Sequence, residues 1–418
     1  MTLKKLALSL AFASTTVLAS TAANAYEYSA DETQYPVVFA HGMAGWDSIA
    51  GYHYFGEDGW GTFIGDACSF MELNGCNDWI ALGQQSNDKA EAFQVTSLHN
   101  SEVRGEELFN HLQSFMATTG YTKVNLVGHS QGGFDIRKAA HRLKDTALNG
   151  VAAGTEKVGA MISLSSPHRG SPYAKKIFDQ LTRDENNVFC GSLPTLPDGS
   201  DPCFAAIIEI ADVMYNFVTG GSTSGNDVIA GGLQLIYEDY DANDGVTTGA
   251  KAFNENYSSE GVAGYVASII TGQDNGNLSP ILAAAGLFLN NFNADADGYC
   301  VDDCNDSGAA GQGDGSTYDM DDDGLVGINS QQMGYRLKYN PNDCAGFLCF
   351  YGNPLDTFTQ VGSTGYVADI NYPSATQMTS HDGKLAMDHL DVISLGPDSL
   401  DEEEFYAAMF DFIESKGF

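Results

Sequence analysis

The pentapeptide Gly128-His129-Ser130-Gln131-Gly132 places a serine between two glycines in the pattern G-x-S-x-G. It follows the apolar, strand-like run 123–127 and precedes 131–143, which has a helical pattern. A sharp turn between strand and helix exposes the Ser130 hydroxyl, and the small flanking residues let the backbone segments approach each other. The Gln131 N–H then lies at the helix N-terminus, where it can stabilise a developing oxyanion. The motif therefore predicts Ser130 as the nucleophile of an acyl-transfer reaction.

A second oxyanion donor is expected from the loop that follows an early strand. The strand-like run 35–40 ends at His41-Gly42-Met43. We predict that the backbone N–H of Met43 is this donor, and we expect a structural role for His41.

These candidates lie in an alternation of strand and helix patterns. Strand-like runs cover 35–40, 123–127 and 158–164. Between the first two, one apolar helical face ends at Gly120; its members are Leu108, Leu112, Phe115 and Met116. The alternation predicts an α/β fold with a mostly parallel sheet and helices on both faces, and the serine turn makes it an α/β-hydrolase fold.

Residues 26–418 are predicted to form this one domain, with several inserted segments. The region of about 170–290 is glycine-rich and polar, and its apolar stretch 204–218 is either a lid or an ordinary buried helix. The segment 293–323 contains ten aspartates and no lysine or arginine, which indicates a solvated loop or a cation site. A further insertion covers 340–385.

The general base and its acid partner should follow the nucleophile in this fold. The histidines after Ser130 are His141, His168, His381 and His389. The first two come too soon after Ser130, so His389, near the end of the chain, is the predicted base and His381 the alternative. Asp323 and Asp244, each followed by glycine, are the two candidates for the acid that orients the imidazole.

Several of these motifs resemble, in the same order, the bacterial lipase family I, the true lipases of Pseudomonas and Burkholderia. The stretches that carry the resemblance are Tyr35-Pro-Val-Val-Phe-Ala-His-Gly-Met43, Ser101-Glu-Val-Arg-Gly-Glu106, Val124-Asn-Leu-Val-Gly-His-Ser-Gln-Gly-Gly133, Ser166-Pro-His-Arg-Gly-Ser171, Asp323-Gly-Leu-Val-Gly327 and His389-Leu-Asp391. The resemblance implies a secreted triacylglycerol lipase that hydrolyses long-chain acylglycerols. It favours Asp323 over Asp244 as the catalytic acid, places a lid helix at 204–220, and implies a dedicated foldase as partner during secretion. The chain departs from the family at Gln131, where histidine is usual, and at Asn329, where the family has a cysteine.

The resemblance also implies one structural Ca²⁺ beside the catalytic histidine. Its ligands would be the Asp391 and Asp295 side chains and the backbone carbonyls of Leu395 and Ser399. Two segments of the acidic region resemble the start of an EF-hand-type loop and offer further oxygen ligands: Asn293, Asp297, Asp319 and Asp321. If the second of these loops bound a cation through Asp323, that carboxylate could not easily serve His389 as well.

Charge and leader pattern limit where the protein acts and what it binds. The chain has 19 Lys+Arg against 55 Asp+Glu, a net charge of −36, which excludes binding to nucleic acid. Residues 1–25 have a basic start, a short apolar core and Ala23-Asn24-Ala25, which predicts a signal peptide and export. No later apolar run approaches the ~20 residues of a transmembrane helix.

Eight cysteines in an exported chain predict disulfides. Because they are close in sequence, the simplest pairing is local: Cys68–Cys76, Cys190–Cys203, Cys300–Cys304 and Cys344–Cys349.

Two other functions compete with the lipase hypothesis. A carboxylesterase, phospholipase or polyester depolymerase would use the same three residues and differ only in its cleft. A calcium-dependent binding protein on a hydrolase scaffold would explain the acidic segment, but it has no need for all of Ser130, His389 and Asp323.

Overall fold

The computed structural model of the chain describes the elements around one central sheet. The described residues are 33–43, 45, 48–49, 52–55, 90–171, 174, 225–237, 249–273, 282, 322–340, 344–345, 348–349, 355–357, 366–373, 383–393, 400 and 402–418. The expected lid segment 204–220 and the acidic segment up to residue 321 lie outside them, so both remain predictions.

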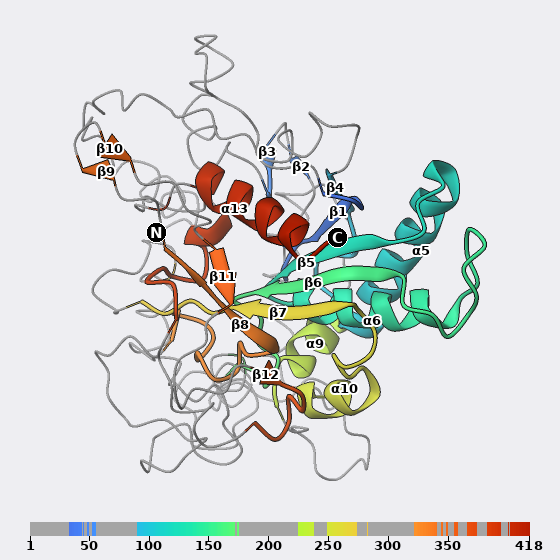
Figure 1. Ribbon diagram of the computed structural model, residues 1–418. Helices are drawn as coiled ribbons and strands as arrows, with labels where there is room; N and C mark the ends of the chain where they lie inside the picture. Colours follow the sequence, from blue (N-terminus) through green and yellow to red (C-terminus); the bar gives the residue numbers. More distant parts are fainter. Residues whose placement is uncertain are drawn as a thin grey trace, which may run out of the picture.

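An eight-stranded sheet forms the centre of the fold (Figure 1). Its strands are β1 (Val37–Ala40), β4 (Ala90–Ala92), β5 (Val124–His129), β6 (Val158–Leu164), β7 (Tyr265–Ile269), β8 (Gly334–Tyr339), β11 (Leu355–Thr357) and β12 (Tyr366–Val367). The order is β11-β8-β7-β6-β5-β1-β4, with β12 also paired to β8. Every pair from β4 to β8 is parallel, whereas β11 and β12 join β8 antiparallel.

Helices cover both faces of this sheet because its strands are apolar on both sides. In β1, Val37 and Phe39 pack on one side in a cluster with α13 (Glu402–Ser415). Val38 and Ala40 pack on the other side in a cluster with α5 (Ser101–Thr119) and α6 (Gly132–Asp145). The predicted α/β class, with its mostly parallel sheet and helices on both faces, is confirmed.

The element boundaries differ by a few residues from those predicted. Strand β5 continues two residues beyond the predicted 123–127, so it ends directly before Ser130. Helix α6 begins at Gly132 rather than residue 131, with Gln131 as its N-cap. Helix α5 ends where predicted, because Gly120 takes a left-handed φ of 81° and its N–H donates to the Met116 carbonyl.

Two short pieces of the predicted insertion 340–385 join the sheet as β11 and β12. It also contains the short antiparallel pair β9 (Cys344–Ala345) and β10 (Leu348–Cys349). The register sets Cys344 opposite Cys349. This backbone arrangement is compatible with the predicted local pairing of these two cysteines; the other six lie outside the described residues.

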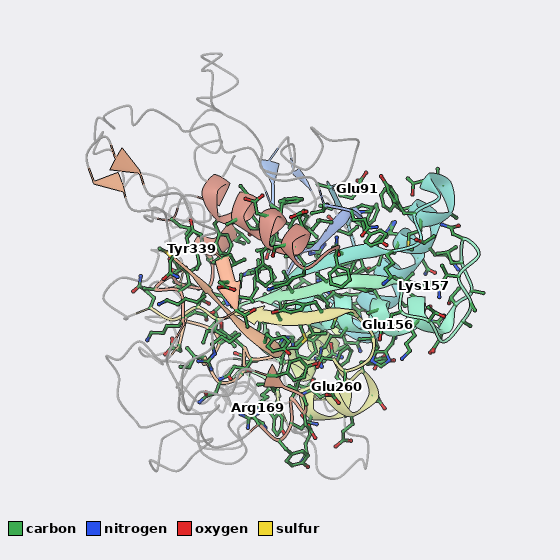
Figure 2. The ribbon with its side chains drawn as sticks, viewed as in Figure 1. Glu91, Glu156, Lys157, Arg169, Glu260 and Tyr339 are labelled. Carbon is green, nitrogen blue, oxygen red and sulfur yellow. The ribbon has the colours of Figure 1, made fainter. Side chains whose placement is uncertain are left out.

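The carboxyl ends of the parallel strands lie together at one end of the sheet. Glu156 and Lys157 lie where β6 begins, while Tyr339 is the last residue of β8 at the opposite, carboxyl end (Figure 2). The loops after β1, β5 and β6 emerge together, because Ala40 pairs with Gly128 and His129 with Leu164. Ligand sites of open α/β sheets form at this carboxyl end.

Three more helices complete the described part of the fold. They are α9 (Gly225–Gln234), α10 (Ala250–Asn256) and the 3-10 turn η2 (Asp391–Ile393). A short hairpin of β2 (Ser48–Ile49) and β3 (Tyr52–His53) follows the β1 loop.

Candidate active site

Ser130 occupies a strained turn between β5 and α6. Its φ is +54°, a left-handed value that non-glycine residues rarely adopt, and its N–H donates to the Leu164 carbonyl at 2.9 Å. Glycine is needed on either side: a Cβ on Gly132 would collide with the Ala40 carbonyl, and one on Gly128 with the backbone of Gly132. The flanking glycines thus allow Ser130 to adopt a strained backbone conformation, and residues with such conformations are frequent at functional sites.

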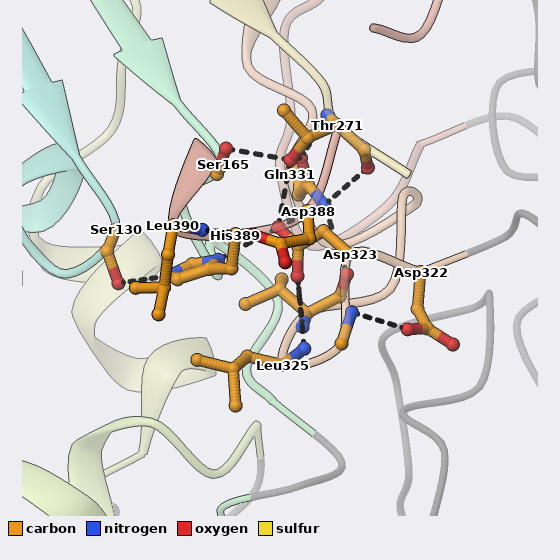
Figure 3. A network of polar contacts seen from close by, with 12 residues as sticks. Ser130, Ser165, Thr271, Asp322, Asp323, Leu325, Gln331, Asp388, His389 and Leu390 are labelled. Atoms are coloured by element: carbon orange, nitrogen blue, oxygen red, sulfur yellow. Dashed lines mark hydrogen bonds and ion pairs between the residues drawn. The ribbon is translucent and has the colours of Figure 1, made fainter. Parts of the chain in front are cut away.

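The His389 ring bridges Ser130 and Asp323 (Figure 3). Its Nε2 lies 2.9 Å from the Ser130 Oγ, and its Nδ1 lies 2.8 Å from the Asp323 Oδ2. The backbone N–H of His389 also donates to the Asp323 carbonyl at 2.9 Å. The structure therefore brings together the three residues predicted as nucleophile, base and acid, while the alternatives Asp244 and His381 lie outside the described residues.

The Asp323 carboxylate is fully buried and saturated with donors. Its Oδ1 accepts the N–H groups of Leu325 and Val326 at 3.1 and 2.8 Å. Its Oδ2 accepts, besides His389, the hydroxyl of Thr271 at 2.9 Å and the amide of Gln331 at 3.2 Å. Both carboxylate oxygens of Asp323 thus have hydrogen-bond donors, and Oδ2 faces His389. The cation site of the acidic loop stays a prediction.

A second hydrogen-bond network connects Tyr54 to the backbone of His389 through the His129 ring. The Tyr54 hydroxyl lies 2.7 Å from the His129 Nδ1, and the His129 Nε2 lies 2.9 Å from the His389 carbonyl oxygen. Since a carbonyl only accepts, Nε2 carries the proton and Tyr54 donates to Nδ1. Burial, reinforced by the nearby His389, holds the pKa of His129 well below its usual value, so the ring is neutral.

The loop after β1, which carries the predicted oxyanion donor Met43, lies directly against the serine. A Cβ on Gly42 would come within 2.8 Å of the Ser130 Cβ, and the Gly42 N–H donates to the Tyr54 hydroxyl at 3.1 Å. Within the described parts of the chain, neither the Met43 N–H nor the Gln131 N–H meets an acceptor. Their assignment as oxyanion donors stays a prediction.

Arg104 of α5 anchors the loop after β1. Its guanidinium donates to the carbonyls of His41 at 2.7 Å and Gly42 at 3.2 Å, and it also reaches the carbonyls of Thr96 and Ser97. Asp135 of α6 neutralises it across 2.8 Å, with both side chains fully buried.

His41 has structural contacts, as expected, and so do His168 and His141, which follow Ser130 too closely to be the predicted base. His41 bonds the Gly42 carbonyl and the Val95 N–H, and burial lowers its pKa to about 3. His168 contacts the Ser163 hydroxyl at 2.9 Å, and His141 donates to the Ser258 carbonyl at 2.7 Å.

Sequence reasoning missed Tyr54, Thr271 and Gln331. Each of these side chains contacts a residue that is distant in the sequence, so no sequence motif predicts the contact. Arg104 lies within one of the stretches that resemble the lipases, which was the only available signal for its role.

The predicted calcium ligands are only partly described. Asp391 opens η2, is buried, and accepts the Asp388 N–H through Oδ2 at 2.7 Å. The side chains in the described ranges form no group of three or more His, Cys, Asp or Glu that could hold a metal ion. The other proposed ligands lie outside those ranges: Asp295, Leu395, Ser399, Asn293, Asp297, Asp319 and Asp321.

Comparisons with known proteins find relatives for part of the chain. Residues 31–192 match the PGAP1-like alpha/beta domain. The chain is 33% identical over 176 residues to a triacylglycerol lipase of Burkholderia plantarii, covering 41% of this chain and 40% of that one. It is 32% identical over 158 residues to a triacylglycerol lipase of Pseudarthrobacter phenanthrenivorans, covering 37% and 40%. The family match includes Ser130 with β5 and α6, and it ends before Asp323 and His389.

The alignments thus span about two fifths of the length of these relatives. Among solved structures, the Staphylococcus hyicus lipase is similar with a TM-score of 0.49 and 14% identity, covering 95% of this chain and 99% of that one.

Of the helices that the structure describes, none has the length and apolar character needed to cross a membrane.

Proposed function

We propose that this chain is a serine ester hydrolase of the triacylglycerol lipase type, secreted and acting on long-chain acylglycerols. One observation carries the proposal: the unbroken line from the Ser130 Oγ through the His389 ring to the buried Asp323 carboxylate, at 2.9 and 2.8 Å. The curated relatives that match part of this chain are named triacylglycerol lipases, which supports the substrate class.

In the first half of the reaction, the Ser130 Oγ forms a bond to the ester carbonyl carbon as its proton passes to the His389 Nε2. The carbonyl π electrons move onto oxygen and give a tetrahedral oxyanion. When the intermediate collapses, the bond to the alcohol breaks and the alcohol oxygen takes the proton from Nε2. This leaves the acyl group on Ser130.

In the second half, water replaces the alcohol. His389 takes a proton from the water as its oxygen attacks the acyl carbon, and the second tetrahedral intermediate releases the fatty acid while the proton returns to the Ser130 Oγ. Asp323 remains ionised throughout; it fixes the tautomer of His389 and stabilises the imidazolium.

The backbone N–H groups of Met43 and Gln131 are proposed to bind the oxyanion in both halves. What supports this is the close approach of Gly42 to Ser130 and the position of Gln131 at the N-terminus of α6. Gln131 is the N-cap of α6, and the loop that carries Met43 is bonded by Arg104 at the His41 and Gly42 carbonyls.

A structural Ca²⁺ forms part of the proposal. The Asp391 carboxylate is buried two residues from His389, and carboxylate oxygen is the ligand that Ca²⁺ prefers. Asp391 and Asp295 would hold the ion with the carbonyls of Leu395 and Ser399, and the remaining acidic-segment residues would be secondary candidates. The ion would stabilise the segment that carries the base.

Export through the periplasm with a dedicated foldase is also proposed. The basic and apolar pattern of residues 1–25 supports export, and the resemblance to family I lipases supports the foldase. Active protein from unaided cytoplasmic expression would contradict the dependence on a foldase and on an oxidising compartment.

The decisive measurement compares initial rates on emulsified long-chain triglyceride and on a soluble short-chain ester, with and without calcium. A lipase is faster on the emulsion, whereas preference for the soluble ester would indicate a carboxylesterase. Ser130→Ala should reduce both rates to about 10⁻³ of wild type or less, and a phosphonate ester should label Ser130 alone. Asp323→Asn should lower the rate far more than Asp244→Asn.

A further inference from the structure

The Asp323 carboxylate receives two side-chain donors that the proposed reaction does not itself use. Thr271 and Gln331 both bond Oδ2, the same oxygen that faces the His389 Nδ1 (Figure 3). All three partners are buried, with Gln331 and Thr271 fully so. The position of this oxygen therefore depends on groups behind it as well as on the histidine.

The amide of Gln331 has one possible orientation. Its Oε1 accepts the Thr271 N–H at 2.8 Å, and its Nε2 donates to the Thr271 carbonyl at 3.0 Å and to the Val326 carbonyl at 3.0 Å. A reversed amide would set its oxygen against both carbonyls and against the Asp323 carboxylate. The two protons of this NH₂ group are shared among the two carbonyls and the Asp323 Oδ2 at 3.2 Å, and the backbone of Thr271 fixes the group so that it faces Asp323.

The Thr271 hydroxyl is fixed in a similar way. It has one proton, and the charged Asp323 Oδ2 at 2.9 Å is a stronger acceptor than the Gln331 Oε1 at 3.2 Å. The Ser165 hydroxyl, 2.7 Å from that of Thr271, must then be the donor in their contact. Ser165 directly follows β6 with a φ of +51°, so a strained residue begins a chain of donors that ends on Asp323.

We propose that Gln331 and Thr271 are positioning residues that hold the Asp323 Oδ2 in line with His389. This inference rests on the proposed ester hydrolase function. Since both side chains are fully buried, they act through Asp323 and not through contact with substrate. Their loss should therefore lower kcat and leave KM unchanged.

A double-mutant cycle tests this path of action. Gln331→Met removes the amide donor at similar volume, and it should lower kcat by about 10- to 100-fold, as expected for a lost hydrogen bond to a charged group. KM should stay within about twofold of wild type. In an Asp323→Asn background the same change should cost less than about twofold, because residues that act as one unit are strongly non-additive.

Gln332→Met is the matched control. Gln332 is the neighbouring buried glutamine, and its amide faces the Asn329 Oδ1 at 3.1 Å instead of Asp323. It should leave kcat close to that of each background. Equal kcat losses for Gln331→Met with and without Asp323 would show a merely structural role and overturn the proposal.

Thr271 provides a second test if Gln331→Met does not fold. Thr271→Val should lower kcat, and Thr271→Ser, which keeps the hydroxyl, should restore it; equal rates for the two variants would count against the proposal. Ser130→Ala run in parallel separates the two levels. Activity that survives Ser130→Ala refutes the proposed function, whereas activity lost there combined with an additive cycle refutes only the positioning role.

Discussion

Arg104 and Asp135 form an ion pair of 2.8 Å in which both side chains are fully buried. Burial raises the pKa of Asp135, although the adjacent Arg104 opposes that rise. The ion pair also affects the active site, because the Arg104 guanidinium donates to the His41 and Gly42 carbonyls. An ion pair between α5 and α6 thereby fixes the loop that lies against Ser130.

Arg104→Lys should destabilise the protein by about 2 kcal/mol or more. Lysine has three donors on one nitrogen and cannot reach four carbonyls and a carboxylate that the planar guanidinium bonds together. The loop would loosen, so kcat should fall with the free energy of unfolding; denaturant unfolding and ester hydrolysis measure the two.

Arg142→Lys is the control for that substitution. Arg142 bonds Glu106 at 2.9 Å between the same two helices, but both side chains are more than a third exposed. Solvent weakens such a pair, so the loss should stay below about 1 kcal/mol with full activity. Equal losses for the two variants would contradict the anchoring role of Arg104.

Tyr54→Phe should lower kcat while the fold remains intact. The change deletes the hydroxyl that accepts from Gly42 and donates to His129, which leaves the buried His129 Nδ1 without its donor. His129 holds the His389 carbonyl, so the base should lose some of its alignment with Ser130. A loss of about tenfold is expected in kcat on a soluble ester. Wild-type kcat in Tyr54→Phe would show that this network does not position His389.

The contrast between predicted and unpredicted site residues has a physical basis. Ser130 could be predicted because the strand–turn–helix context is local, and His389 because chain order in this fold restricts the base. The Tyr54–His129 contact joins positions 75 residues apart, and Gln331 reaches Thr271 across 60. Tyrosine, threonine and glutamine occur everywhere in proteins, so only the folded chain shows which of them meet.

The same distinction applies to the fold. Strand β6 was predicted with its observed bounds, because its seven residues form a mostly apolar run, as is typical of a strand buried on both faces. Strands β11 and β12 were missed because they are two or three residues long and are defined by their pairing with β8.

Stability should fall as the pH decreases from about 6.5 toward 3, in part because of His41. Burial, aided by Arg104, lowers the pKa of this ring to about 3 in the folded protein. Between the two pKa values the unfolded chain binds a proton that the folded chain does not, so the free energy of unfolding rises with pH and falls with acid. One such proton contributes a slope of up to about 1.4 kcal/mol per pH unit.

His41→Gln should remove that contribution. Denaturant unfolding at pH 7 and pH 5 should therefore show a smaller acid loss for the variant than for the wild type, even if the variant is less stable at both. Identical pH dependence would mean that His41 is not the neutral buried ring described above.

Calcium should stabilise the fold without taking part in the chemical step. Asp391 lies two residues from His389 and is buried, so an ion bound there would fix the segment that carries the base. The net charge of −36 acts in the same direction, because a divalent cation relieves repulsion among carboxylates. Binding to the folded state alone adds about 2.7 kcal/mol at a hundredfold excess over Kd.

A chelator should therefore lower the Tm first and the activity second. Asp391→Ala should reproduce most of that loss, and Asp295→Ala should do the same if it is the second ligand. Asp145→Ala, at the exposed end of α6, removes the same charge elsewhere and should leave the response to calcium unchanged. If chelation changes neither Tm nor activity, the calcium site is wrong, and the hydrogen-bonded line of Ser130, His389 and Asp323 stands without it.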